Sequence, residues 1–98
     1  MNIQAMMKQA QKIQKDMLTA KDEIEKKVFI GKSSFVTAEV MGNKKVSKIK
    51  INAENLELDD IEILEDMVLT AVNDAMNQID KETESKMGKF TNGMPGLF

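Results

Sequence analysis

The amino-acid sequence predicts a small α+β domain in the order α-β-β-β-α, with a three-stranded antiparallel sheet and two long helices. Three patterns predict it: an apolar seam with helical spacing over residues 3–24, short strand segments over residues 28–51, and a wide apolar stripe over residues 61–79. The 98 residues make one domain, near the lower size limit for a core that is stable alone. Because the helices are long for such a short chain, we expect a homo-oligomer.

The first predicted helix covers residues 1–27, and its apolar residues recur at alternate spacings of three and four. The seam consists of Ile3, Met6, Ala10, Ile13, Met17, Ala20 and Ile24. Such a narrow stripe must pack against another element or another chain. Ile13, Met17 and Ile24 are therefore candidate core or dimer contacts, and we expect residues 1–12 to extend toward solvent.

Three strands are predicted next. The first covers residues 28–30 and ends at Gly31, and the other two cover residues 35–41 and 45–51. The last two join at Gly42-Asn43, a pair that suits a two-residue hairpin turn.

This turn would place Val36 opposite Ile49 and gather the apolar side chains on one face of the sheet. The sheet should therefore be covered on that face only. The other face carries Thr37, Glu39, Lys48 and Lys50.

The second predicted helix begins at Asp59, an N-cap candidate that can form a capping box with Glu62. Its apolar stripe is wide enough to pack on a sheet or against two neighbours. Leu64, Val68 and Val72 on this stripe are further candidate core or dimer contacts.

The apolar stripe fades after Ile79, where polar residues take the next positions. We place the end of the helix at Gly88, a plausible C′ residue. Residues 89–98 contain two further glycines and the only proline, so we expect them to form a flexible tail.

Composition argues against an enzyme. The chain has no histidine, cysteine or arginine, so the usual general bases, thiolate nucleophiles and soft-metal ligands are missing. We assign no catalytic residue, metal site, cofactor or small-molecule substrate. The carboxylates of Asp59, Asp60 and Glu62 fit helix capping better than a divalent-metal site. No apolar run is long enough for a membrane span and no signal peptide is visible, so we expect a cytoplasmic protein without a membrane partner.

Charge divides between the two halves of the chain. Residues 1–53 carry 11 lysines against 5 acidic residues, a net charge of +6. Residues 54–98 carry 3 lysines against 11 acidic residues, a net charge of −8, and the two halves give the total of −2. The division predicts either an interaction surface or two faces that attract each other within the fold.

Seven lysines are candidate contacts to a polyanion. Lys8, Lys12 and Lys15 share one helical stripe that can follow phosphates, although a solvated helix face explains them too. Lysine lacks the planar fork with which arginine reads guanine, so such contacts should be mainly to the phosphate backbone. The seven are Lys8, Lys12 and Lys15, Lys44 and Lys45 at the hairpin turn, and Lys86 and Lys89, which also complement the dipole of the second helix.

Three segments resemble the YbaB/EbfC family of bacterial nucleoid-associated proteins. Residues 7–12, Met-Lys-Gln-Ala-Gln-Lys, followed by Gln14, resemble the opening motif of that family. Residues 64–68 and 71–75, Leu-Glu-Asp-Met-Val and Ala-Val-Asn-Asp-Ala, resemble its second-helix signature. The ending 93–98, Gly-Met-Pro-Gly-Leu-Phe, is similar to its C-terminal tail.

The resemblance implies a homodimer shaped like tweezers, with a sheet-based centre and projecting helical arms. It also implies duplex DNA as the partner, a place in the nucleoid and no catalytic activity. The leading hypothesis is therefore a nucleoid-associated protein that binds DNA through the phosphate backbone with little base-specific readout. The alternative is a protein–protein adaptor whose helical seam and acidic second half recruit partners.

Overall fold

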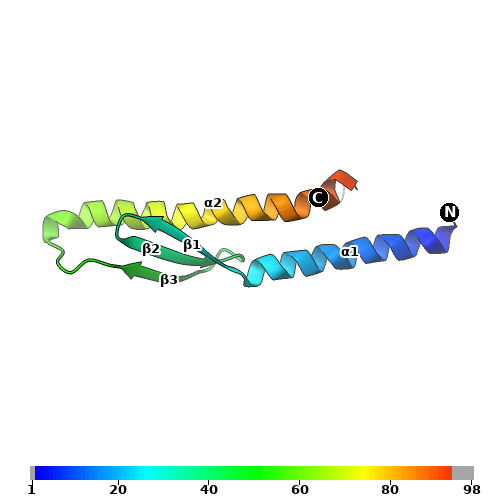
Figure 1. The fold of residues 1–98 in the computed structure, drawn as a ribbon, viewed down its shortest axis with the longest axis horizontal. Helices are drawn as coiled ribbons and strands as arrows, with labels where there is room; N and C mark the ends of the chain where they lie inside the picture. The colour runs from blue at the N-terminus through cyan, green and yellow to red at the C-terminus, as the bar shows by residue number, and fades with distance from the viewer. Residues whose placement is uncertain (1, 94–98) are drawn as a thin grey trace.

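The computed structural model describes residues 2–93 and confirms the predicted order of elements. The sheet is antiparallel with strand order β1-β2-β3. Figure 1 shows α2 running along the sheet, while α1 leaves the sheet and extends beside the C-terminal half of α2. The elements are α1 (Ile3–Lys26), β1 (Val28–Ser33), β2 (Val36–Met41), β3 (Val46–Ile51), the 3₁₀ turn η1 (Leu58–Asp60) and α2 (Ile61–Gly93).

The molecule is elongated, with dimensions of 71 × 19 × 13 Å. Its radius of gyration is 19.5 Å, whereas a compact chain of this length has about 13 Å. The core lies where α2 crosses β1 and β2, next to the C-terminal end of α1. It consists of Ile24, Phe29, Val36, Ala38, Val40, Ala71, Ala75 and Ile79. Long parts of both helices therefore lie outside the core of this chain.

Small residues let α2 lie directly on the sheet. Ala71 and Ala75 are one helical turn apart and face Gly31 in β1. A Cβ atom on Gly31 would lie 1.9 Å from the carbonyl oxygen of Ala71 and 2.6 Å from the backbone nitrogen of Ala75. Gly31 therefore does not end the first strand as the sequence predicted. It serves the close approach of helix and strand, and β1 continues to Ser33.

The two hairpins differ from the predicted turns. A two-residue turn joins β1 to β2, and Ser34 at its first position has a φ of 52°. The second hairpin has a three-residue loop in which the Lys44 N–H donates to the Met41 carbonyl at 2.7 Å. Lys44, with a φ of 70°, takes the left-handed position of this loop, whereas the sequence predicted a two-residue turn at Gly42-Asn43.

The longer loop shifts the register of β3. Val36 pairs with Ile51 instead of Ile49, and an irregularity between Glu39 and Val40 absorbs one further residue. Because the shift at Val36 and Ala38 is two residues, Ile49 and Ile51 keep the predicted face. At Val40 the shift is only one residue, so Val46 lies on this apolar face, whereas the predicted turn would put it on the other. One apolar face is therefore confirmed, although the predicted pairing is wrong.

Both ends of α2 differ from the predicted ones. Asp59 does not cap the helix, because it lies inside the 3₁₀ turn that precedes α2, and the Asp60 carboxylate accepts from the N–H of Glu57, the N-cap of that turn, at 3.1 Å. At the other end, α2 continues through Gly88 to Gly93. The predicted end at Gly88 was wrong because one glycine inside a helix costs only about 1 kcal/mol. The rest of the predicted tail, 94–98, lies outside the described residues. Between residues 2 and 93, no helix is long and apolar enough to cross a membrane.

Candidate nucleic-acid interface

The N-terminal part of α1, residues 2–15, is called the basic arm here. Residues 2–12 are all exposed, whereas Ile24 near the other end of the helix is only 3% exposed. The arm contains no acidic residue. Helical geometry places its lysines on the side opposite the apolar seam. These exposed lysines are Lys8, Lys12 and Lys15.

The six predicted core or dimer contacts divide into two groups. Ile24 belongs to the core, and on α2 the half-buried Leu64, Val68 and Val72 pack against that core. Ile13 and Met17 are half-buried and lie outside it. Burial thus decreases along α1 from its C-terminal end toward the arm.

Short contacts fix α1 where it meets the sheet. The Lys27 ammonium lies 2.6 Å from the Glu82 carboxylate on α2 and 5.2 Å from the centre of the Phe29 ring. The Gly42 N–H donates to the Lys27 carbonyl at 2.9 Å, which joins the second hairpin to the end of α1. The direction of the arm is therefore set by contacts to both α2 and the sheet.

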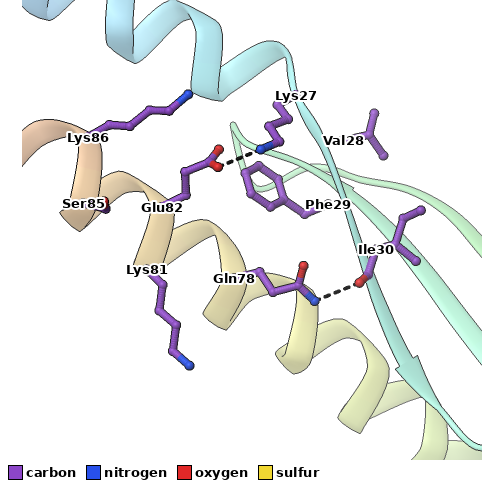
Figure 2. A pocket seen from close by; sticks show the side chains of 9 residues that line it. All are labelled: Lys27, Val28, Phe29, Ile30, Gln78, Lys81, Glu82, Ser85 and Lys86. Carbon is purple, nitrogen blue, oxygen red and sulfur yellow. Dashed lines mark hydrogen bonds and ion pairs between the residues drawn. The ribbon is translucent and has the colours of Figure 1, made fainter.

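An open groove of about 620 Å³ lies between the edge of β1 and α2 (Figure 2). Its apolar floor comes from Val28 to Ile30, and Gln78 donates from α2 to the Ile30 carbonyl at 2.8 Å. Further along the same edge, Asp74 accepts from the backbone N–H of Lys32 at 3.1 Å. Two side chains of α2 thus satisfy backbone groups that an edge strand would otherwise expose.

Two further lysines are held by carboxylates. Lys44 at the second hairpin lies 3.2 Å from Asp80 of α2, so this candidate contact also ties the hairpin to the helix. Lys26 lies 2.9 Å from Asp22, and the hydrogen bond and charge of Asp22 raise the pKa of Lys26.

The structure does not bring the seven candidate lysines into one cluster. Lys45 is exposed beside Lys44 at the hairpin, away from the lysines of the arm. Lys86 is half-buried in the groove of Figure 2, where it and Lys81 project to opposite sides of Glu82. Lys89 is exposed, with its ammonium 5.1 Å from the centre of the Phe90 ring. The basic arm is the one stretch where three of the seven share a helical stripe.

Comparison with known proteins identifies the family of this chain. The sequence model of the YbaB/EbfC DNA-binding family matches residues 1–94. The chain belongs to the YbaB/EbfC family.

Family members from three bacteria illustrate the similarity, and each bears the name nucleoid-associated protein. The protein of Lactococcus lactis subsp. cremoris MG1363 is 50% identical over 97 residues, which is 97% of this chain and 98% of the relative. That of Ligilactobacillus salivarius is 46% identical over 99% of this chain and 95% of the relative. That of Enterococcus faecalis is 43% identical over 98% of this chain and 94% of the relative.

The structure of this YbaB/EbfC chain also presents lysines that the sequence did not single out as contacts. Lys32 joins Lys48 and Lys50 on the sheet face opposite α2, which we call the open face. The alternating pattern of β3 in the sequence already places Lys48 and Lys50 on one face. Lys32 could be added only from the structure, because β1 extends to Ser33 and pairs with β2.

An apolar surface remains uncovered on the other side of the sheet. β3 makes almost no contact with α2, so Val46, Ile49 and Ile51 stay exposed although they lie on the covered face. On α2, an open and mainly apolar groove of about 430 Å³ lies on the side away from Asp74 and Gln78. Because these two residues bind β1 and β3 is the other edge strand, we infer that this side is turned toward β3. We call it the apolar flank, and its apolar residues are Ile61, Leu64, Val68, Leu69 and Val72, with Glu65 also in the lining.

Proposed function

We propose that the protein is a nucleoid-associated protein of the cytoplasm that binds duplex DNA as a homodimer, mainly through the phosphate backbone. The observation that carries the proposal is the basic arm, in which Lys8, Lys12 and Lys15 are exposed on a helix that projects from the core. Membership of a DNA-binding family and the name of the relatives support the same partner.

The chemistry of the arm favours phosphates over bases. Lysine is a flexible point charge, and the chain contains no arginine with which to read base edges bidentately. A net charge of −2 is compatible with DNA binding because the positive charge is concentrated locally. Each phosphate neutralised by a lysine releases counterions, so affinity must fall as salt rises.

The uncovered apolar surface supports the proposed homodimer. α2 uses its polar side, through Asp74 and Gln78, to cover the edge of β1, and its apolar flank faces the unfilled space over β3. The α2 of a second copy fits this space, where it would cover Ile49 and Ile51 and pack against the flank. A two-fold arrangement of this kind covers the same surface on both subunits.

The role of the basic arm is tested by measuring DNA affinity across salt concentrations for two triple variants of equal net charge. Lys8/Lys12/Lys15→Gln removes three positive charges from the arm, and the control Asn52/Asn55/Asn77→Asp adds three negative charges at exposed sites elsewhere. Fluorescence anisotropy with a labelled duplex gives the slope of log affinity against log salt. The variant Lys8/Lys12/Lys15→Gln, called the arm triple, should show a slope that is smaller in magnitude by up to about 2.7, since each lost phosphate contact removes about 0.9.

The control should bind more weakly than the unaltered protein only through its net charge and should keep the full slope. An arm triple with the slope and affinity of the control would refute the role of the arm.

The same apolar surface defines the second candidate function, a protein–protein adaptor. In an adaptor, a different protein instead of a second copy covers the apolar flank. A chain that sediments at 11.0 kDa and forms no complex with duplex DNA at low ionic strength would favour the adaptor.

A further inference from the structure

We propose that the open face of the sheet is a second contact surface for the phosphate backbone of duplex DNA, separate from the basic arm. Lys32, Lys48 and Lys50 are its contact residues. This inference rests on the proposed DNA binding, but it does not depend on the arm, because the two surfaces share no residue.

The strand register places the three lysines close together. Lys32, Thr37 and Lys50 form one row across the three strands, and Lys48 lies in the next row, opposite Glu39. Strand spacing puts the Cα atoms of Lys32 and Lys50 about 10 Å apart, and those of Lys48 and Lys50 about 7 Å apart. Three flexible ammonium groups at this spacing can contact several phosphates of one duplex at once.

Charge is segregated between the layers of the fold. Residues 28–51 carry five lysines and only one acidic residue, Glu39, a net charge of +4. The helix on the other face, Ile61–Gly93, carries three lysines and seven acidic residues, a net charge of −4. Two of the five lysines, Lys44 and Lys45, lie in the hairpin loop. The open face itself carries Lys32, Lys48 and Lys50 against Glu39, a net charge of +2, although the whole chain is acidic.

The lysines of the open face are exposed, and none of them forms an ion pair within residues 2–93. The ion pairs of that part of the chain involve Lys26, Lys27 and Lys44 instead. Asp74 binds the backbone N–H of Lys32 and not its ammonium. Glu39 lies directly opposite Lys48 across β2 and β3, so the sheet itself accounts for one of the three lysines. Lys32 and Lys50 have Thr37 between them and no acidic residue opposite.

The proposed dimer leaves this surface accessible. The apolar flank and the exposed side chains of β3 lie on the side of the sheet that α2 covers. A second copy that docks there leaves the open face free on each subunit. The dimer would therefore offer two basic sheet faces in addition to its arms.

The test compares two triple variants with equal charge change. Lys32/Lys48/Lys50→Gln and Lys8/Lys12/Lys15→Gln each remove three positive charges, and both are titrated with the same duplex across salt concentrations. We expect the sheet triple to lower the magnitude of the salt slope by up to about 2.7. We also expect the losses in slope to add when the two triples are combined. Circular dichroism and sedimentation confirm that each variant keeps its fold and mass.

A measurement on the unaltered protein avoids any folding defect of the variants. Acetylation of lysines is followed by mass spectrometry with and without duplex DNA. Lys32, Lys48 and Lys50 should be acetylated several-fold more slowly in the complex.

The outcomes separate the two proposals. An unchanged salt slope in the sheet triple, with no protection of Lys32, Lys48 and Lys50 from acetylation, overturns the inference. If the arm triple shows a reduced slope in the same experiment, the proposed function stands. Absence of any DNA complex with the unaltered protein at low salt overturns both. If the sheet triple loses only its binding to phosphatidylglycerol vesicles, the open face is a lipid contact and the inference is wrong.

Discussion

At the scale of single residues, two glycines serve close packing, one inside β1 and one in the second hairpin loop. Gly31 lets α2 approach the sheet, and a Cβ atom on Gly42 would lie 1.7 Å from the carbonyl oxygen of Ile24 in α1. Both positions bring two backbones together, which no side chain allows. Gly88, inside α2, is different because a Cβ atom there meets nothing within 4 Å.

Substitutions at these glycines should have opposite effects. Gly31→Ala forces α2 off the sheet and should lower the free energy of unfolding by about 3 kcal/mol. Gly88→Ala should raise it by about 0.5 to 1 kcal/mol, because alanine has the higher helix propensity and meets open space. Denaturant unfolding of both variants measures this difference. Equal stability of the two would contradict the close contact between β1 and α2.

At the scale of elements, α2 protects one edge of the sheet and leaves the other open. Asp74 and Gln78 bind backbone groups of β1, so this edge cannot easily pair with another strand. β3 has no such cover from α2. The open edge and the apolar flank therefore lie on the same side of the molecule.

The hydrogen bond at the β1 edge can be tested at one amide. Asp74→Ala removes the acceptor for the Lys32 N–H and should destabilise the fold by about 1 kcal/mol. Hydrogen exchange at Lys32 should accelerate, whereas Asp74→Asn keeps an acceptor oxygen and should preserve most of the protection. Unchanged exchange at Lys32 in Asp74→Ala would show that the bond does not form in solution.

Sequence pattern predicted the elements well and their connections poorly. Periodicity was sufficient to predict both helices and the apolar face of β2, because burial imposes it, but it put Val46 of β3 on the wrong face. It missed the three-residue loop because Lys44, not a glycine, adopts the positive φ. It placed the end of α2 at Gly88 because the low helix propensity of one glycine does not show that the helix continues through it to Gly93. The lysines of the arm were visible as a stripe, but the open face required the pairing of β1 with β2.

At the scale of the whole molecule, the separation of charge explains how an acidic chain could bind a polyanion. The elongated shape keeps the basic arm away from the core, and the sheet separates positive strands from the acidic α2. In the proposed complex, lysines on two distinct surfaces face the DNA, and the apolar flank holds the two subunits together. The basic arm, the open face and the apolar flank share no residue, so each surface can be substituted separately.

The dimer is tested with two leucines of equal exposure. Leu69 on the apolar flank and Leu18 on α1 are each 61% exposed in the single chain. In an isolated chain, an exposed leucine changed to lysine has an effect within about 0.5 kcal/mol. Leu69→Lys should therefore reduce the mass in sedimentation from twice 11.0 kDa to 11.0 kDa, and Leu18→Lys should leave it unchanged. A dimer that persists in Leu69→Lys would place the interface elsewhere.

The central claim is that lysines bind the phosphate backbone with little regard to sequence. The most direct measurement is the affinity of the unaltered protein for two duplexes of equal length and different sequence, across a range of salt concentrations. We predict affinities that agree within a few-fold and fall in parallel with salt, with a log–log slope of about −0.9 per phosphate contacted. An affinity that stays constant as salt rises, or that differs by about 10³ between the duplexes, would contradict the claim.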